Sequence, residues 1–185
     1  MKYEELGVVP IINACGTVTR LGGAPLHTAA IAAYDSAAQQ SVAIEELQIA
    51  VSQQLSQWLD CEAGLIASGA AAALTLGTAA ILAGTDLARM EALPEATQFP
   101  NELLIACDQR SGYDHAVRAA GAKLVAVGMN EVVSGAGVRR VEPWEYAAAI
   151  TEQTVGILYV QTDSSRPLLA DVIRVAKEHG LPVLV

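Results

Sequence analysis

The sequence predicts an α/β fold with a mostly parallel sheet covered by helices on both faces. Short, nearly all-apolar segments alternate with helix-length segments from residue 63 to the end of the chain. Strands that are apolar on both faces are typical of parallel sheets, because helices then cover both sides. Hydrophobic residues make up 52% of the 185 residues and charged residues 17%, which predicts a packed core rather than a disordered chain.

An arm and two helices are expected before this alternating region. Residues 1–26 are rich in Gly, Pro and Thr and predict an irregular N-terminal arm, and a helix is expected over 28–39. The next helix is expected to follow Ser41 as its N-cap, because apolar residues then recur at spacings of three and four. These residues are Ile44, Leu47, Val51, Leu55 and Trp58. We divide the chain into the arm and first helix (1–40) and the first part of a large domain (41–185).

Five strands and four helices are expected in the alternating region. The strands are 63–67, 102–106, 123–127, 155–160 and 182–185, and the helices are 69–83, 112–120, 143–151 and 168–179. Gly121 and Gly180 follow two of the helices, as C-terminal stop signals do, and Pro143 suits a first helical turn. Long loops are expected at 85–101 and 128–142. The chain ends within an apolar segment, so the fold is expected to be incomplete at the C-terminus.

Charge and composition argue against several classes of protein. Eleven basic and twenty acidic residues give a net charge of −9, which argues against a general nucleic-acid-binding surface. The three cysteines have no metal-binding spacing, so we expect reduced thiols, no metal site and a cytoplasmic location. Residues 63–85 carry no charge, but a Ser-Gly break divides them into a strand and a helix, which favours a buried helix over a membrane span.

The main candidate for chemistry is the turn Ser68-Gly69-Ala70. An apolar strand is predicted to end here and an alanine-rich helix to begin. Such a turn leaves backbone N–H groups and a hydroxyl at a helix N-terminus, where they can bind a phosphate. The alternative is an ordinary serine N-cap on a core helix.

Polar residues also follow two of the predicted strands. The carboxyl ends of parallel strands face the usual ligand crevice. After the strand 102–106, Arg110 could meet an anion, and Tyr113 or His115 could stack on a ring; the alternative is a polar loop in which Ser111 or Asp114 caps the next helix.

After the strand 155–160 comes a polar cluster, residues 161–166, that includes Asp163. In the arm, Asn13, Thr17 and Arg20 either reach a substrate or belong to a solvated segment.

Several blocks of sequence resemble the family of selenocysteine synthase (L-seryl-tRNA selenium transferase) and, more closely, its relatives of the D-glucosaminate-6-phosphate ammonia lyase type. They run in the family's order from residue 11 to residue 185. The blocks are 11–17 (IINACGT), 21–26 (LGGAPL), 44–47 (IEEL), 61–73 (CEAGLIASGAAAA), 112–116 (GYDHA), 118–124 (RAAGAKL) and 179–183 (HGLPV).

The resemblance implies the large domain of the aspartate-aminotransferase-like fold (fold type I), with pyridoxal phosphate as cofactor. Ser68, Gly69 and Ala70 match the family's phosphate-binding turn. Gln109 or His115 falls near the residue that stacks on the pyridine ring, although relatives are expected to have His at the position of Gln109. Asp163 matches a polar stretch beside the cofactor. Asn13, Arg20 and Arg110 remain candidates for binding substrate.

The family's catalytic lysine is expected beyond residue 185, as is the aspartate that pairs with the pyridine nitrogen. None of Lys2, Lys123 and Lys177 lies where an active-site lysine is expected, so no catalytic residue is assigned within this chain. We therefore expect the N-terminal portion of a pyridoxal-phosphate-dependent lyase or dehydratase that acts on an amino acid or amino-sugar acid. A homo-oligomer with shared sites is expected.

Three alternatives remain. One is a non-catalytic truncated paralogue that acts as a structural or interaction partner. Another is an L-seryl-tRNA selenium transferase, which the acidic composition and the sequence Met129-Asn130-Glu131 argue against. The last is a Rossmann-like binding module, which the absence of a GxGxxG fingerprint argues against.

Overall fold

The chain forms two compact units, Met1–Leu65 and Ile66–Val185, which are described separately. The computed structural model describes residues 2–129, 131–133 and 137–185. None of the described helices combines the length and the apolar character needed to cross a bilayer.

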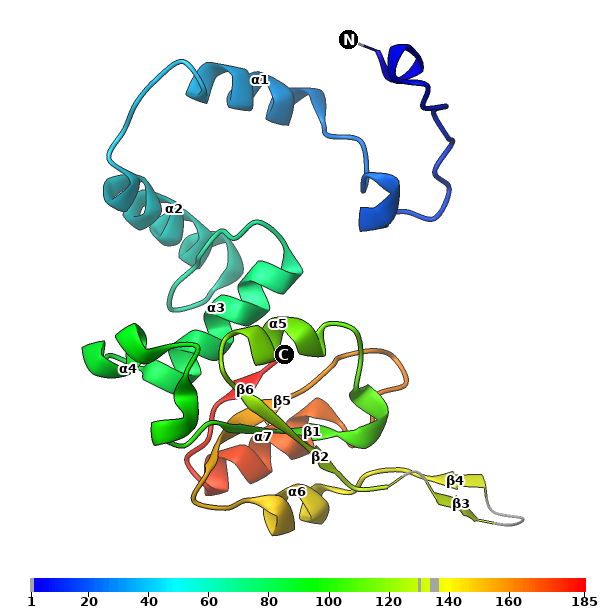
Figure 1. Cartoon of the computed structure of the whole chain (residues 1–185), viewed down its shortest axis with the longest axis vertical. Coiled ribbons are helices and arrows are strands. Elements are labelled where there is room, and N and C mark those ends of the chain that lie inside the picture. Colours follow the sequence, from blue (N-terminus) through cyan, green and yellow to red (C-terminus); the bar gives the residue numbers. More distant parts are fainter. Residues whose placement is uncertain (1, 130, 134–136) are drawn as a thin grey trace. The chain divides into compact units, whose positions relative to one another are not determined.

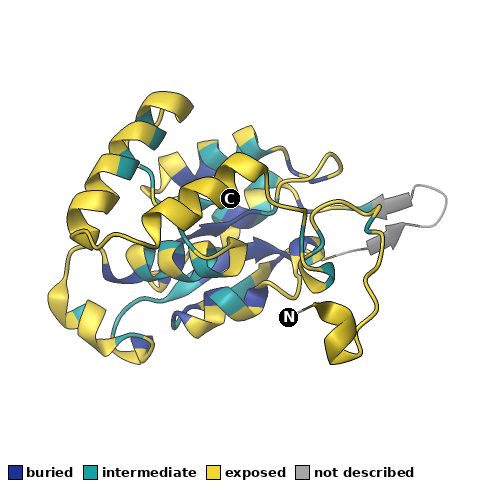
Figure 2. Ribbon diagram, turned by 90° about the horizontal axis from the view of Figure 1, so that it is seen from above, coloured by how far each residue is buried: buried dark blue, intermediate teal, exposed yellow. Residues whose placement is uncertain are grey.

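The first unit consists of short helical segments joined by extended chain. They are the 3-10 turns η1 (Tyr3–Leu6) and η2 (Thr19–Leu21) and the helices α1 (Thr28–Ala37) and α2 (Ile44–Leu59). The predicted helices are thus confirmed, but Ser41 as N-cap is wrong: the N-cap of α2 is Ala43, which offers no side-chain hydrogen bond. Neither helix has a buried residue. The buried (dark blue) residues in Figure 2 gather on the sheet and the helices beside it.

The second unit holds the remaining elements. In order along the chain they are α3 (Ala70–Ala83), α4 (Leu87–Ala92), η3 (Ala96–Gln98), β1 (Glu102–Ala106), η4 (Cys107–Gln109), α5 (Asp114–Ala119), β2 (Lys123–Val127), β3 (Glu131–Val133), β4 (Gly137–Arg139), α6 (Pro143–Ala149), β5 (Thr154–Leu158), α7 (Leu169–Glu178) and β6 (Val183–Leu184). Figure 1 shows this arrangement. Pro143 begins α6, and Gly121 and Gly180 adopt positive φ after α5 and α7, as predicted.

Four of these strands form a parallel sheet in the order β2-β1-β5-β6, which confirms the predicted α/β class. Leu104 of β1 lies opposite Val125 of β2 and Ile157 of β5. Side chains of β1 alternate between two hydrophobic clusters. Leu104 and Ala106 pack in a cluster with α6 and α7, and Leu103 and Ile105 in a cluster with α3 and α5. Helices therefore cover both faces of the sheet (Figure 1).

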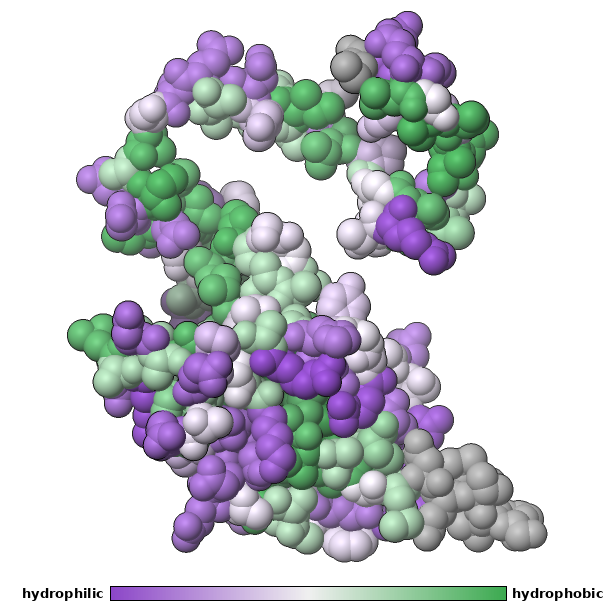
Figure 3. Space-filling view, viewed as in Figure 1, coloured by the Kyte–Doolittle hydropathy of each residue, from purple (hydrophilic) through white to green (hydrophobic). Residues whose placement is uncertain are grey.

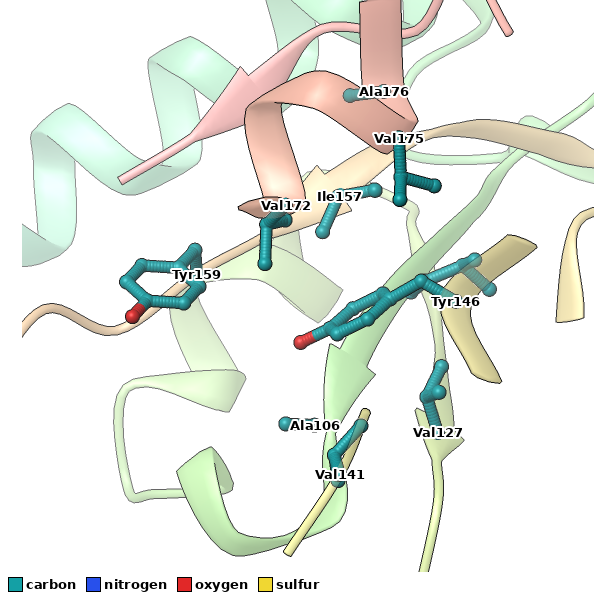
Figure 4. Packing of buried hydrophobic residues seen from close by; sticks show 10 residues of the cluster. Ala106, Val127, Val141, Tyr146, Ile157, Tyr159, Val172, Val175 and Ala176 are labelled. Carbon is teal, nitrogen blue, oxygen red and sulfur yellow. The ribbon is translucent and has the colours of Figure 1, made fainter. Parts of the chain in front are cut away.

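The cluster on the α6–α7 face contains a buried tyrosine. Figure 4 shows the ring of Tyr146 among Ala106, Val127, Ile157 and other apolar residues. Its side chain is 0% exposed, and its hydroxyl makes no hydrogen bond with any described residue. Burial in this apolar surrounding raises the pKa of the Tyr146 hydroxyl well above its usual range, because ionisation there would leave an unsolvated charge.

Some of the predicted elements are wrong. Residues 63–67 are not a strand: no described strand pairs with them, and within the first unit the Gly64 N–H donates to Ser52 Oγ of α2 at 3.1 Å. The predicted loop 85–101 contains α4, whose N-cap Asp86 accepts hydrogen bonds from two backbone N–H groups. The predicted loop 128–142 contains the antiparallel pair β3–β4; its residues 130 and 134–136 lie outside the described residues.

The order of the strands creates a reversal between β1 and β5. From β1 the chain passes through α5 to β2 on one side, and from β5 it passes through α7 to β6 on the other. The connecting helices α5 and α7 lie on opposite faces of the sheet. In open α/β sheets, ligands bind outside the carboxyl ends of the strands at such a reversal.

Candidate functional site

A hollow of about 400 Å³ lies at the carboxyl ends of β5 and β6 and is called here the first hollow. Small apolar side chains of α3, Ala70, Ala73 and Leu74, form one wall. Val160 and Gln161, which follow β5, form another. The hollow therefore lies beside the reversal between β1 and β5, where the topology predicts a ligand.

The N-terminus of α3 borders this hollow through Ala70. Gly69 is the N-cap, with φ +118°, and no side chain caps the first N–H groups of the helix. The alternative reading of Ser68 as an ordinary N-cap is therefore wrong, because Ser68 precedes the N-cap and makes no capping bond. A β-carbon at Gly69 would meet open space, but its φ is one that L-residues rarely adopt. The first turn of α3 thus presents N–H groups without side-chain acceptors.

Gln109 lies beneath the loops rather than in the hollow. Its side chain is 8% exposed, and its Oε1 accepts a hydrogen bond of 2.9 Å from the Val160 N–H. Its Nε2 has no acceptor among the described residues. Gln109 therefore joins the chain after β1 to the chain after β5 and holds Val160, which lines the hollow.

Arg110 is engaged by a neighbouring carboxylate. Its Nε donates to Asp114 Oδ2 at 2.5 Å, while Asp114 Oδ1 accepts from the Ser111 N–H at 3.2 Å. Asp114 is buried, so the ion pair neutralises a carboxylate on the edge of the first hollow. Asp114 is therefore not the N-cap of α5, as one alternative predicted: the N-cap is Tyr113, and Asp114 bonds to the loop before the helix.

The turn after β5 is organised by Ser165. The Ser165 hydroxyl donates to the Val160 carbonyl at 2.7 Å and accepts from the Thr162 N–H at 2.8 Å. Asp163 lies at the exposed surface of this turn and lines neither hollow described here. Any contact of Asp163 with a cofactor therefore remains a prediction.

A second, more open hollow of about 730 Å³ lies between α3 and α5. Its lining includes Thr75, Ser111, Tyr113 and His115, of which Ser111 and Tyr113 also line the first hollow. His115 Nδ1 lies 3.1 Å from a guanidinium nitrogen of Arg118. The structure thus brings His115 and Ala70 to adjoining hollows through the shared residues Ser111 and Tyr113.

The two candidates in the arm belong to the first unit. Asn13 organises a turn there: its Nδ2 donates to the carbonyls of Gly16 (2.8 Å) and Gly23 (3.2 Å), and its Oδ1 accepts from the Cys15 N–H. Arg20 lies in η2 with an exposed side chain. The roles of Asn13 and Arg20 in substrate binding stay predictions.

Neither lysine of the second unit lies at these hollows. Lys123 pairs with Glu102 at 2.7 Å, and both are the first residues of their strands, at the opposite edge of the sheet. Lys177 lies in the last turn of α7. Within the described part of the chain, no three His, Cys, Asp or Glu side chains group as a metal site would require.

Two contributors to the site had no clear signal in the sequence. Tyr159 lines the first hollow and donates its hydroxyl to the Pro167 carbonyl at 2.9 Å, which fixes the end of the turn after β5. Ser165 is the buried centre of that turn, but as one of several polar residues in a row it could not be distinguished from Ser164 by sequence.

The sequence of this chain is similar to those of two known enzymes. No family model matches the chain. Over its whole length the chain is 31% identical to 5'-C-glycyluridine monooxygenase-decarboxylase from Streptomyces sp, of which it covers 47%. It is 28% identical over 99% of its length to D-glucosaminate-6-phosphate ammonia lyase from Salmonella typhimurium (strain 14028s / SGSC 2262), of which it covers 50%.

The structure agrees with this similarity. A solved structure of D-glucosaminate-6-phosphate ammonia-lyase superposes on 98% of the chain with a TM-score of 0.88 and 27% sequence identity, and the match covers 49% of that structure. The chain spans about half the length of the curated relatives it matches. The predicted resemblance is therefore confirmed: this chain is a homologue of D-glucosaminate-6-phosphate ammonia lyase over about half of that enzyme's length.

Proposed function

We propose that this chain is the cofactor-binding part of a pyridoxal-phosphate-dependent lyase of the aspartate-aminotransferase-like fold (fold type I). Its substrate would be an amino acid or an amino-sugar acid. The observation that carries the proposal is the homology to an ammonia lyase across 99% of the chain. The position of the first hollow supports it, because the hollow adjoins both the start of α3 and the strand ends.

The residues around the first hollow fit pyridoxal phosphate chemically. The first turn of α3 offers N–H groups that no side chain caps, which suits a phosphate. The walls formed by Ala73, Leu74 and Val160 are apolar at the positions where a flat ring would lie. Ser68, Gly69 and Ala70 would hold the phosphate, as the resemblance implies.

The chain's own residues would orient and shield the bound cofactor. Pyridoxal phosphate supplies an electron sink that stabilises negative charge on the carbon bearing the substrate's amino group. Gln109 would hold the Val160 backbone against the ring site, and the apolar wall of α3 would exclude water from it. Tyr113, which is 54% exposed, would flank the entrance.

The proposal is tested by titrating the complete protein, purified from its own cells and freed of cofactor, with pyridoxal phosphate. We expect saturable binding with a visible absorption band and, with an amino-sugar acid as substrate, release of ammonia. No binding at saturating cofactor would refute the proposal.

A charge placed at Ser68 makes this test specific. Ser68 is exposed, so the added carboxylate of Ser68→Asp acts through a water-like dielectric. A unit charge about 6 Å from a phosphate dianion then costs ~1.4 kcal/mol, or about tenfold in Kd. Ser68→Ala is the control, which removes the hydroxyl without adding charge. Equal affinity of the two variants would argue against a phosphate at this turn.

A second reaction class is favoured by the relative of 31% identity, whose name describes oxidation and decarboxylation. We infer that the same binding site could serve such a reaction in place of elimination. Measuring oxygen consumption and carbon dioxide release beside ammonia release separates the two classes.

A further inference from the structure

The second hollow offers hydrogen-bond donors without matching acceptors. Ser111 Oγ accepts from the Tyr113 N–H at 3.3 Å, but no described residue accepts the Ser111 hydroxyl proton. The Tyr113 hydroxyl likewise has no partner among the residues that the structure describes. Both residues line the hollow, so two hydroxyl groups there are free to donate.

His115 adds a third donor. A guanidinium can only donate, so the contact of 3.1 Å between Arg118 and His115 Nδ1 makes Nδ1 the acceptor. In the neutral imidazole the ring proton then resides on Nε2, which has no acceptor in the described part of the chain. Arg118 also places a positive charge beside the hollow.

Several backbone carbonyls around the same hollow already accept a hydrogen bond. The Thr75 hydroxyl shares its one proton between the carbonyls of Ala71 and Ala116, each 3.0 Å from Oγ1. The Gly112 carbonyl accepts from the His115 N–H, and the Tyr113 carbonyl from the Ala116 N–H. The free donors of Ser111, Tyr113 and His115 therefore suit a group that accepts several hydrogen bonds.

The nearby negative charge is also compensated. Asp114 is paired with Arg110 and accepts the Ser111 N–H, so its carboxylate is neutralised. Because the guanidinium of Arg118 lies beside the hollow, the net charge there is positive and favours an anion.

We propose that the second hollow binds an anionic oxygen group of the substrate, a carboxylate or a phosphate, at a position separate from the cofactor's phosphate. This inference rests on the proposed function, because it takes the first hollow as the cofactor site. Ser111 and Tyr113 line both hollows, so a substrate that reacts in the first can extend its anionic group into the second.

The test is calorimetric titration of the complete protein saturated with pyridoxal phosphate, which fills the site at α3. The probes are inorganic phosphate and acetate. His115→Ala removes an exposed group that lines the hollow, and Arg118→Gln removes the exposed guanidinium that contacts His115 beside it. Arg174→Gln is the matched control, because it removes an exposed guanidinium of α7 that pairs with Asp171.

We expect the affinity for the bound probe to fall about tenfold in Arg118→Gln and in His115→Ala and to stay unchanged in Arg174→Gln. Tighter binding of phosphate would identify a phosphate subsite, and tighter binding of acetate a carboxylate subsite. Binding of neither probe, or equal affinity in all variants, would overturn the inference. So would weaker binding of pyridoxal phosphate itself in the two variants, since the hollow would then hold the cofactor's phosphate.

A failure of the proposed function can be distinguished from a failure of this inference. If the wild-type protein takes up no pyridoxal phosphate, the same titrations are made on Ser68→Asp protein, in which the added charge disfavours phosphate at α3. Sensitivity of the bound anion to Arg118→Gln and His115→Ala would still support an anion site in the second hollow, and insensitivity would overturn it.

Discussion

Gln109→Met tests whether Gln109 holds the floor of the first hollow. The substitution keeps the approximate length of the side chain but removes Oε1, the acceptor of the Val160 N–H. Gln109 is 8% exposed, so water cannot readily replace the lost acceptor. An unsatisfied buried donor costs about 1–3 kcal/mol in free energy of unfolding.

The expected loss is measurable by thermal unfolding. A loss of about 2 kcal/mol lowers Tm by about 4–8 °C for a chain of this size. Circular dichroism of the cofactor-free protein is the assay, because any effect there is independent of cofactor contacts. We expect the same variant to bind pyridoxal phosphate more weakly, since Val160 lines the hollow that we propose for the cofactor ring.

Gln109→Glu is the matched variant. A carboxyl group retains an acceptor for the Val160 N–H, but ionisation would bury an unpaired charge, so its pKa in the folded protein should be raised. Its stability should approach that of wild type near pH 4 and decline as pH rises beyond it. Unchanged stability of Gln109→Met would refute the reasoning, and an altered cofactor spectrum without a change in Tm would instead indicate contact with the ring.

Two further substitutions, Tyr146→Phe and Gly121→Ala, test packing within the second unit, and Gly180→Ala is the control for the second. Tyr146→Phe removes a buried hydroxyl that has no described partner, so urea titration at neutral pH should show a gain of about 1 kcal/mol. The pKa of Tyr146 is raised on folding, so above about pH 10 this tyrosine ionises in the unfolded chain before it does in the folded protein. The free energy of unfolding of wild type therefore falls there by up to ~1.4 kcal/mol per pH unit. The variant should lack this contribution. Gly121→Ala places a β-carbon against the Pro94 carbonyl oxygen at φ +103° and should cost about 2–4 kcal/mol by urea titration. Gly180→Ala, at φ +67° with nothing within 4 Å, should cost only about 1 kcal/mol, and equal losses would contradict the steric explanation.

The sequence predicts the parallel sheet and its helices well because each signal is local. The apolar segment at β1 and the proline that begins α6 act through their own neighbours. Residues 63–67 carry the same kind of apolar signal, yet a strand needs a partner, and here Gly64 bonds to α2 instead. The helix α4 could have been found from Asp86, which caps it.

The position of the candidate residues at one edge of the sheet could be predicted from the sequence, but their contacts could not. Polar residues after two strands indicate a ligand site at one edge of the sheet, and the two hollows lie there. Sequence cannot show that Arg110 is occupied by Asp114, because that pairing depends on the loop geometry before α5. For the same reason, Gln109 could not be recognised as a buried link to Val160, which is 51 residues away.

The two edges of the sheet differ in what their residues do, and this difference bears on how the family could evolve. At the starts of β1 and β2, Glu102 and Lys123 form an ion pair that joins the two strands away from both hollows. At the opposite edge, the two hollows are lined by α3 together with residues of the loops that follow β1 and β5. Exposed side chains of those loops, such as Tyr113 and Asp163, can therefore be exchanged with little effect on the sheet, whereas the buried Gln109 cannot. One ancestral scaffold could in this way give rise to enzymes with reactions as different as those named for the two relatives.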